Sequence, residues 1–222
     1  MPRIARAVAT EFPHHIVQRG NNRQNVFVSP EDREKYRFLL RKYSVKWESP
    51  ILVYCFMTNH IHLLARPLRE ESLHKMMQGV TLCYTQYFNK TYGRTGRLWE
   101  SRFYSCAVQQ EHYLWAVARY IEQNPVRAGM TEHAEDYPYS SAKAHVQGAK
   151  DELLNEELFT QDLRHDYISL LRSDIPEKDL TAIRYTARTG RPYGSESFAD
   201  MVGRTLNRRL TPGRAGRPRK QS

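Results

Sequence analysis

Two histidines separated by a single residue, His60 and His62, are the side chains of this 222-residue sequence best suited to chemistry. They lie in the segment His60–Ala65, whose composition predicts a strand. Side chains of a strand alternate between its faces, so the two imidazoles face one side and the apolar Ile61 and Leu63 face the other. Neighbouring imidazoles are suitable ligands for a divalent metal, although this spacing alone more often belongs to a structural or solvated pair.

A tyrosine and an asparagine four residues apart, Tyr120 and Asn124, form the second candidate group. They fall on one face of a helix predicted at residues 111–123, which Asn124 and Pro125 terminate. A phenol with a pKa of about 10 is a weak nucleophile at neutral pH, but a nearby base or cation makes it competent. Asparagine offers a carbonyl oxygen to a metal, and a metal polarises the phosphate in phosphodiester cleavage. The residues alone leave open that Tyr120, one of 14 tyrosines, is an ordinary helix-face aromatic.

The elements that must position these groups follow from hydrophobic patterning. Strands are predicted at residues 14–19, 51–57, 60–65 and 103–108, and helices at 30–47, 72–92 and 111–123. The seven apolar residues at 51–57 indicate a central strand buried on both faces. The order βαββαβ followed by a helix predicts an α+β fold of the ferredoxin-like type, an antiparallel sheet with two helices on one face. We expect the third helix to cover the other face.

The charge of the sequence suggests a polyanionic partner. The formal net charge is +10, divided into +9 over residues 1–130, −7 over 131–179 and +8 over 180–222. The two basic segments predict surfaces that attract nucleic acid, although solubilising charge would also explain the first one. No apolar stretch approaches the ~20 residues of a membrane-spanning helix, and the beginning of the sequence lacks a secretory pattern. We therefore expect a cytoplasmic, nucleoid-associated protein without a membrane partner, whose three cysteines are reduced.

Three segments, in this order, resemble motifs of the single-tyrosine HUH transposases. They are Met57-Thr-Asn-His-Ile-His-Leu-Leu64, Arg94-Thr-Gly-Arg-Leu-Trp-Glu-Ser-Arg102 and Tyr120-Ile-Glu-Gln-Asn-Pro-Val-Arg-Ala-Gly129. The similarity is greatest to the REP-associated tyrosine transposases, which are related to small bacterial insertion-sequence transposases. It covers about residues 1–145.

This resemblance implies a mechanism. It makes His60, His62 and Asn124 ligands of a divalent metal, Mg²⁺ or Mn²⁺, and makes Tyr120 the nucleophile. Some insertion-sequence members carry glutamine at the place of Asn124. In the family, the tyrosine attacks a phosphate of single-stranded DNA, which gives a 5′-phosphotyrosine link and a free 3′-hydroxyl. Tyr104 and Tyr113 are rival nucleophiles by position, but neither has a carboxamide four residues on.

The resemblance also implies a DNA partner, since family members bind DNA hairpins and a short guide sequence beside them. Candidate DNA-binding residues in the first turn and in the basic loop are Arg19, Asn21, Asn22, Arg23, Arg94, Arg97 and Arg102, with Trp99 available to stack on an unpaired base. Near the end of the sequence, Gly216-Arg-Pro-Arg219 resembles the core of an AT-hook, which makes Arg217 and Arg219 further candidates.

Four regions are predicted. Residues 1–145 form the catalytic domain, 146–179 an acidic helical connector, 180–213 a small basic helical module and 214–222 a disordered basic tail. Within the later regions, helices are expected in 151–175, 177–187 and 195–210. The last two would form a module of helix-turn-helix size whose second helix carries Arg204, Arg208 and Arg209.

The sequence thus predicts an enzyme, a metal-dependent nickase and strand transferase that acts on single-stranded, hairpin-bearing DNA as a monomer or homodimer. One alternative is a catalytically inactive DNA-binding or regulatory protein with the same fold. A second alternative keeps the metal but uses water as the nucleophile, which would make the protein a simple phosphodiesterase.

Overall fold

A four-stranded antiparallel sheet forms the centre of the structure, a computed structural model that describes residues 8–110, 112–207 and 210. Its strands are β1 (His14–Arg19), β2 (Ile51–Phe56), β3 (His60–Ala65) and β4 (Tyr104–Ala107), in the order β2-β3-β1-β4. This order and the helices between the strands confirm the predicted α+β, ferredoxin-like fold. Residues Arg217 and Arg219 of the predicted tail lie outside the described residues.

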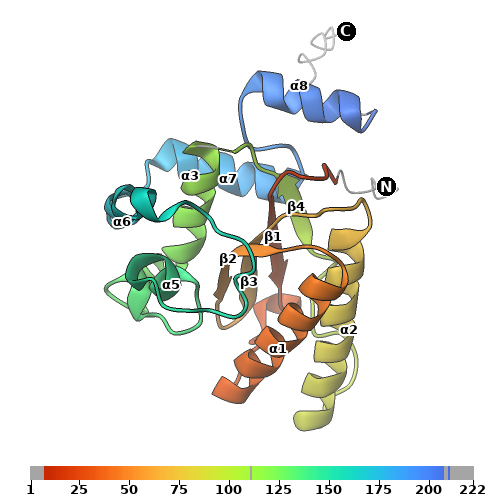
Figure 1. The fold of residues 1–222 in the computed structure, drawn as a ribbon. Helices are drawn as coiled ribbons and strands as arrows, with labels where there is room; N and C mark the ends of the chain where they lie inside the picture. The colour runs from red at the N-terminus through yellow and green to blue at the C-terminus, as the bar shows by residue number, and fades with distance from the viewer. Residues whose placement is uncertain (1–7, 111, 208–209, 211–222) are drawn as a thin grey trace, which may run out of the picture.

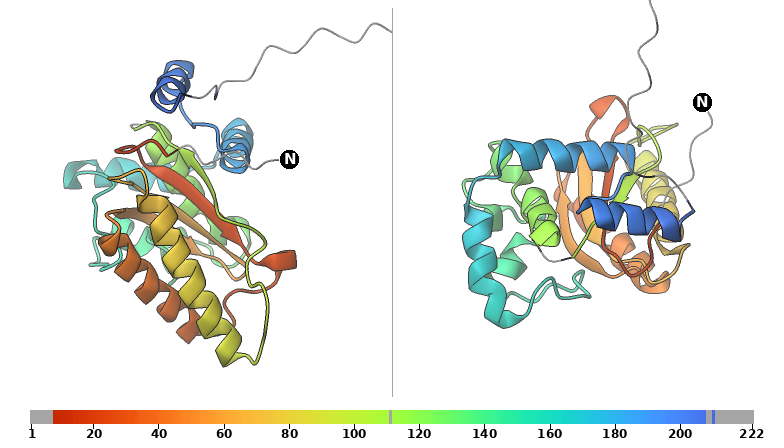
Figure 2. Two further views of the ribbon diagram at one scale, coloured as in Figure 1. Left: turned by 90° about the vertical axis from the view of Figure 1, so that its right-hand side faces the viewer. Right: turned by 90° about the horizontal axis from the view of Figure 1, so that it is seen from above.

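Two helices, α1 (Pro30–Lys46) and α2 (Ser72–Thr91), lie side by side on one face of the sheet (Figures 1 and 2). The first begins as predicted, because the carboxylate of Asp32 accepts the backbone N–H of Ser29 at 3.1 Å. The second begins at Ser72, as predicted, with Glu71 as its N-cap. Between these helices and the sheet lies a core that is rich in aromatic rings.

The opposite face of the sheet is covered by α3 (His112–Glu122), as predicted, and by α7 (Glu177–Thr189) (Figure 1). The helix that carries Tyr120 was expected to end at Asn124-Pro125. Instead a short helix, α4 (Asn124–Arg127), begins there, since a proline in the first turn gives up no helical hydrogen bond.

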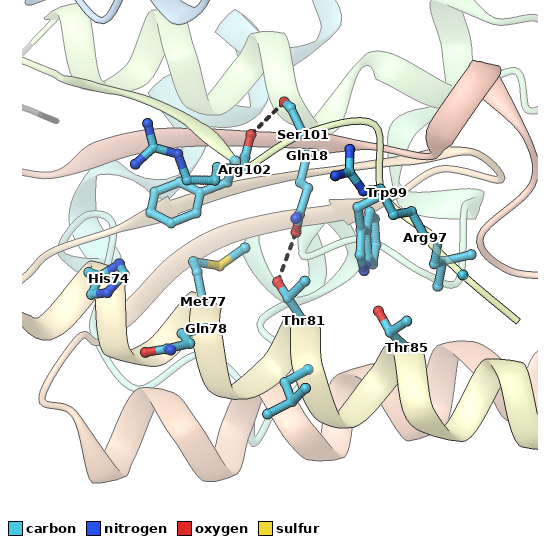
Figure 3. A pocket seen from close by; sticks show the side chains of 14 residues that line it. Gln18, His74, Met77, Gln78, Thr81, Thr85, Arg97, Trp99, Ser101 and Arg102 are labelled. Atoms are coloured by element: carbon cyan, nitrogen blue, oxygen red, sulfur yellow. Dashed lines mark hydrogen bonds between the residues drawn. The ribbon is translucent and has the colours of Figure 1, made fainter. Parts of the chain in front are cut away.

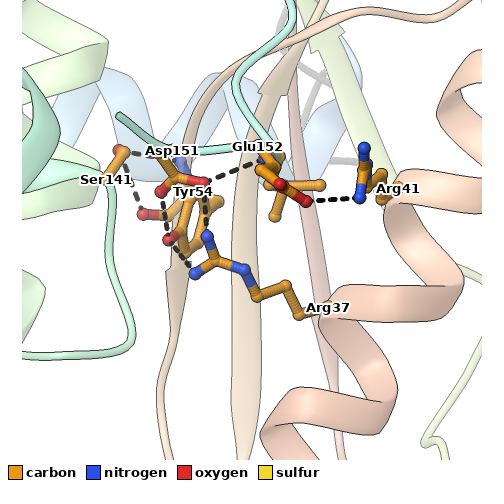
Figure 4. A network of polar contacts seen from close by, with 7 residues as sticks. Arg37, Arg41, Tyr54, Ser141, Asp151 and Glu152 are labelled. Carbon is orange, nitrogen blue, oxygen red and sulfur yellow. Dashed lines mark hydrogen bonds and ion pairs between the residues drawn. The ribbon is translucent and has the colours of Figure 1, made fainter. Parts of the chain in front are cut away.

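The acidic connector is less helical than predicted. Helical structure is limited to η3 (Gln161–Leu163) and α6 (Arg164–Arg172), and residues 151–160 run as a non-helical strap. Ion pairs hold this strap to α1 and to the residue after β3. Those with α1 join Asp151 to Arg37 and Glu152 to Arg41, each at 2.5 Å (Figure 4). The third joins Glu156 to Arg66 at 2.8 Å. These distributed ion pairs and the burial of Leu153 in the α1/α2 core favour an extended path over a helix.

The last helices also pack on the sheet. Residue Ile183 of α7 is buried against the α3 side, and α8 (Glu196–Thr205) places Phe198 and Val202 against Ala9 and Ala107. Arg208 and Arg209 lie outside the described residues. The division of the chain at residues 146, 180 and 214 stays a prediction. In the described part of the chain, no helix combines the length and apolar character needed to span a bilayer.

A completely buried carboxylate, that of Glu122, fixes α3 to the helices that follow it. Its oxygens accept hydrogen bonds from Ser141 Oγ at 2.5 Å, from Tyr167 Oη on α6 at 2.7 Å, and from Nδ1 of His145 on α5 (Ala142–Gln147) at 2.7 Å. A buried carboxylate is favourable only when its oxygens are paired in this way. The network therefore sets the position of the helix that carries Tyr120.

Replacing Glu122 by leucine should destabilise the protein by about 3 kcal/mol, because three buried donors lose their acceptor. The free energy of unfolding in urea measures this loss. The matched control is Glu152→Ala, whose carboxylate is 60% exposed and whose ion pair should contribute less than about 1 kcal/mol. Equal effects of the two substitutions would contradict the structural role given to Glu122.

Candidate active site

The two histidines of β3 lie on the face of the sheet that α3 covers. In the antiparallel register, His62 lies opposite Val17 of β1 and Cys55 of β2, and His60 lies opposite Arg19. The imidazole centroids are 5.1 Å apart. His62 is almost fully buried and His60 is partly exposed, so the pair reaches from the interior to the rim of the sheet.

Hydrogen bonds at Nδ1 determine which ring nitrogens remain for a ligand. Nδ1 of His60 lies 2.6 Å from Oδ1 of Asn59, whose amide is oriented by donation from Nδ2 to the Arg23 carbonyl at 3.2 Å. Because an amide oxygen only accepts, His60 carries its proton on Nδ1 and presents a lone pair at Nε2. Nδ1 of His62 is also engaged, at 3.0 Å from Nε2 of His15. Both histidines therefore have Nε2 as the atom left for a metal.

Burial keeps these imidazoles neutral. It lowers the pKa of His60 to about 4, with a further contribution from the Arg19 guanidinium, and it lowers the pKa of His62 well below its usual value. A metal ligand must be the neutral imidazole, so the charge state fits coordination.

Tyr120 lies against the histidines, on the inner side of α3. Its ring meets that of His62 edge-on with the centroids 5.7 Å apart, and it meets that of His15 at 5.8 Å. Only 7% of Tyr120 is exposed. The structure therefore brings the predicted nucleophile and the HUH histidines together from two distant parts of the chain.

A cation that sequence reasoning missed lies against the ring of this tyrosine. The guanidinium carbon of Arg127 is 4.5 Å from the centroid of the Tyr120 ring, and its Nη2 donates to the Tyr120 carbonyl oxygen at 2.8 Å. Arg127 follows Tyr120 by two helical turns, so its spacing could have indicated a place on the same side.

The side chain of Asn124 forms hydrogen bonds with backbone atoms at the end of α3. Its Nδ2 donates to the carbonyl oxygens of Tyr120 and Ile121, each at 3.0 Å, and so caps the end of α3. The predicted face of a single helix is thus interrupted between these two residues. The amide oxygen Oδ1 is the end of Asn124 that could bind a metal.

The donor set differs from that of a structural metal site. No group of three or more His, Cys, Asp or Glu side chains in the described parts of the chain is arranged to hold a metal. The two Nε2 atoms form an incomplete set, to which the amide oxygen of Asn124 is a predicted addition, and such a set suits a cation that also takes water and phosphate oxygens. The engaged Nδ1 atoms orient both rings in the manner of metal-binding histidines, so these residues fit a catalytic divalent cation.

The candidate DNA-binding residues of the first turn and of the basic loop meet at one end of the sheet. The backbone N–H of Asn21 donates to the Leu98 carbonyl at 2.8 Å, and that of Glu100 donates to the Arg19 carbonyl at 3.0 Å. Arg19 pairs with Glu100, whereas the side chains of Arg23, Arg94, Arg97 and Arg102 are exposed together with Asn22. We call this surface, residues 19–23 and 94–102, the basic end.

Trp99 is less accessible than a stacking platform. It is 5% exposed and packs beside Tyr36 and Tyr84, each with centroids 6.1 Å away. It lines a cavity of about 500 Å³ between α2 and the loop, with Arg97 and Arg102 beside it (Figure 3). This cavity adjoins Gln18, on the face of the sheet opposite to His62, and is therefore separate from the site around Tyr120.

The rival tyrosines do not contact these histidines. Tyr104 is on β4, 44% exposed, and separated from His62 by Val17 in the strand register, and the ring of Tyr113 packs against that of Tyr193 with centroids 5.3 Å apart. Neither has a ring contact with His60 or His62 among the described residues. Of the tyrosines considered from the sequence, Tyr120 is the one placed for chemistry with these histidines.

This chain is similar to known transposases. A family model described as "Transposase IS200 like" matches residues 9–124. The solved structure of a REP-associated tyrosine transposase bound to a REP hairpin is similar, with a TM-score of 0.55 and 16% sequence identity over 72% of this chain and 94% of that chain. A crystal structure described as a candidate transposase from Deinococcus radiodurans R1 matches with a TM-score of 0.39 and 16% identity, over 55% of this chain and 96% of that one. No curated protein matches this chain.

Substituting His60 or His62 by alanine should weaken Mn²⁺ binding by more than about 100-fold, since each change removes a direct nitrogen ligand. Isothermal titration of the full chain at pH 7 measures the affinity. His74→Ala is the control, because His74 is an exposed histidine on α2, against the opposite face of the sheet. An unchanged affinity in both β3 variants would show that the metal binds elsewhere.

Proposed function

Because the chain belongs to the family of IS200-like transposases, we propose that it cleaves and rejoins single-stranded, hairpin-bearing DNA through a 5′-phosphotyrosine intermediate. Family membership makes it an enzyme of the transposase kind, and the family match spans His60, His62 and Tyr120. The single observation that supports the chemistry best is the edge-on contact between the rings of Tyr120 and His62. This contact brings the proposed nucleophile next to one of the two proposed histidine ligands.

In the proposed reaction, Tyr120 Oη forms a bond with the phosphorus of a DNA phosphodiester. The bond from phosphorus to the 3′ oxygen breaks, the phenol gives up its proton, and the departing 3′ oxygen takes up a proton. A divalent cation held by His60, His62 and Asn124 would supply polarisation of the phosphate and stabilise charge on its oxygens. The covalent intermediate keeps one ester bond for each ester bond broken, so rejoining to another 3′-hydroxyl needs no nucleotide cofactor.

Arg127 has a separate role in this proposal. Its guanidinium lies against the Tyr120 ring, where a positive charge stabilises the phenolate that develops as the phenol attacks or leaves. The same group keeps its charge at every physiological pH. Two positive charges would thus act in the reaction. The divalent cation would act on the phosphate, and Arg127 would act on the tyrosine.

The basic end is the proposed DNA-binding surface. Its exposed arginines can contact backbone phosphates, and Arg19 lies directly beside His60 in the strand register. A related structure is described as bound to a REP hairpin, which supports a hairpin as the partner of this chain. Contacts from Arg217 and Arg219 remain predictions on residues outside those described.

Trapping of a covalent adduct tests the function. Full-length protein with Mn²⁺ and a labelled single-stranded hairpin oligonucleotide, taken from DNA that flanks the coding region, should give a protein–DNA adduct resistant to denaturing gel electrophoresis. Tyr120→Phe should lower adduct yield by more than about 1,000-fold because the nucleophilic oxygen is lost. Tyr104→Phe should leave the yield unchanged, because Val17 separates Tyr104 from His62 in the strand register and Tyr104 does not contact the His60 or His62 ring.

The alternatives give different results in the same assay. Strand cleavage that survives Tyr120→Phe and needs His60 would assign the reaction to a metal-activated water. Hairpin binding without cleavage in the unmodified protein would assign the chain to the inactive DNA-binding class. Either result would overturn the proposed strand transfer.

Replacing Arg127 by methionine should slow adduct formation by about 100-fold, the typical effect of removing one charge-stabilising group from an active site. Methionine retains packing volume against the Tyr120 ring but not the charge. Single-turnover kinetics measure the rate, and Mn²⁺ affinity should stay within about threefold of the original. Arg172→Met, at an exposed position on α6, is the control. An unaltered rate would remove Arg127 from the reaction.

A further inference from the structure

We infer that His15 is a positioning residue that accepts a hydrogen bond from His62 and holds its Nε2 toward the metal site; the inference rests on the proposed function. His15 lies on β1 and is 1% exposed. Its Nε2 is 3.0 Å from Nδ1 of His62, and the two rings stack with an interplanar angle of 19°. Among the described residues, His15 is the histidine whose ring forms a hydrogen bond with the His62 ring.

The direction of the hydrogen bond between His15 and His62 decides whether His62 can bind a metal. Each neutral imidazole carries one proton, so an N···N hydrogen bond has a donor and an acceptor. If His62 donates from Nδ1, its Nε2 has a free lone pair and can bind a cation. If His15 donates from Nε2 instead, His62 carries its proton on Nε2 and cannot coordinate there. The metal-competent state therefore requires His15 to be the acceptor.

The residues around His15 hold its ring beside His62. In the strand register, it lies between Leu64 of β3 and Cys106 of β4, both fully buried. The Tyr120 ring of α3 packs against it at an interplanar angle of 74°, with centroids 5.8 Å apart. Close packing from β3, β4 and α3 thus restricts rotation of the His15 ring.

The surroundings of the other nitrogen of His15 affect which of the two rings donates the hydrogen bond. Nδ1 of His15 is buried and has no hydrogen-bond partner among the described residues. In the metal-competent state this atom carries the proton, and a buried donor without an acceptor is unfavourable. A bound cation on Nε2 of His62 would hold the pair in that state. His15 thus couples an internal proton position to occupancy of the metal site.

His15 is not itself a proposed ligand. Its Nε2 is occupied by His62, and its unpaired Nδ1 points to no group of His, Cys, Asp or Glu that could complete a metal site in the described residues. Its effect on the cation must pass through His62. A positioning residue of this kind typically changes metal affinity by about 10- to 100-fold.

Strand β1 supplies a matched control in the preceding residue. His14 is also completely buried, but it faces the other side of the sheet, where its Nε2 contacts the backbone of Ala9. The pair His15→Leu and His14→Leu therefore compares two buried histidines on adjacent positions of one strand. His15→Gln adds a variant that keeps a hydrogen-bond acceptor for His62 and serves if the leucine variant fails to fold.

Two measurements on the full chain test the inference. In ¹⁵N-histidine-labelled, metal-free protein, a scalar coupling across the hydrogen bond should join Nε2 of His15 to Nδ1 of His62, should persist in His14→Leu and should vanish in His15→Leu. By titration, His15→Leu should weaken Mn²⁺ binding by about 10- to 100-fold, and His14→Leu by less than about threefold. His15→Gln should recover most of the affinity because its amide oxygen can accept from His62.

The outcomes separate the inference from the function. Absence of Mn²⁺ binding in the unmodified protein and in His14→Leu would refute the proposed metal site and the inference with it. Normal binding by the unmodified protein and by His15→Leu would overturn the inference alone. The inference is also overturned if His15→Leu loses adduct formation with unchanged Mn²⁺ affinity, since His15 would then act on Tyr120.

Discussion

The alternation of side chains along β3, combined with its antiparallel register to β1, is the constraint on which the site depends. It places His60, His62 and, from β1, His15 and Arg19 on a single face of the sheet. A shift of one residue in this register would send the imidazoles into the aromatic core under α1 and α2. The chemistry is therefore determined by strand pairing before any loop contributes.

The helix that carries Tyr120, the proposed nucleophile, is fixed by segments far along the chain. The Glu122 carboxylate joins α3 to α5 and α6, and Arg119, on the same helix, donates to Ser173 Oγ at 2.8 Å. The strap at 151–160 in turn holds these helices to the sheet by ion pairs and by Leu153. Residues after 127 thus support a site whose proposed functional groups all precede them, which gives the acidic region a structural role.

Local patterns were sufficient for the strands, for the three helices before residue 124 and for placing the two histidines of β3 on one face. The apolar run at 51–57 and the break at Asn124-Pro125 are short-range signals, and the structure has a strand at Ile51–Phe56 and the end of α3 at Glu122. His15 and Arg127 were missed because their importance arises from pairing between β1 and β3 and from a turn after α3. The strap was predicted as helix because its leucines have helical spacing, whereas long-range ion pairs determine its path. Trp99 resembled a surface residue for the same reason, since its aromatic partners are distant in sequence.

Electrostatics connect the basic end to the reacting groups. Burial keeps the imidazoles uncharged, so the fixed positive charges beside them are the guanidinium groups of Arg19 and Arg127. Arg19 is adjacent to His60 at the rim, and Arg127 lies against the ring of Tyr120. In the proposed function, these two charges attract a DNA phosphate to the face of the sheet that carries the histidines. The cavity beside Trp99 lies on the opposite face, because it adjoins Gln18. The position of the charges, rather than the size of the cavity, therefore favours the histidine face as the proposed place of reaction.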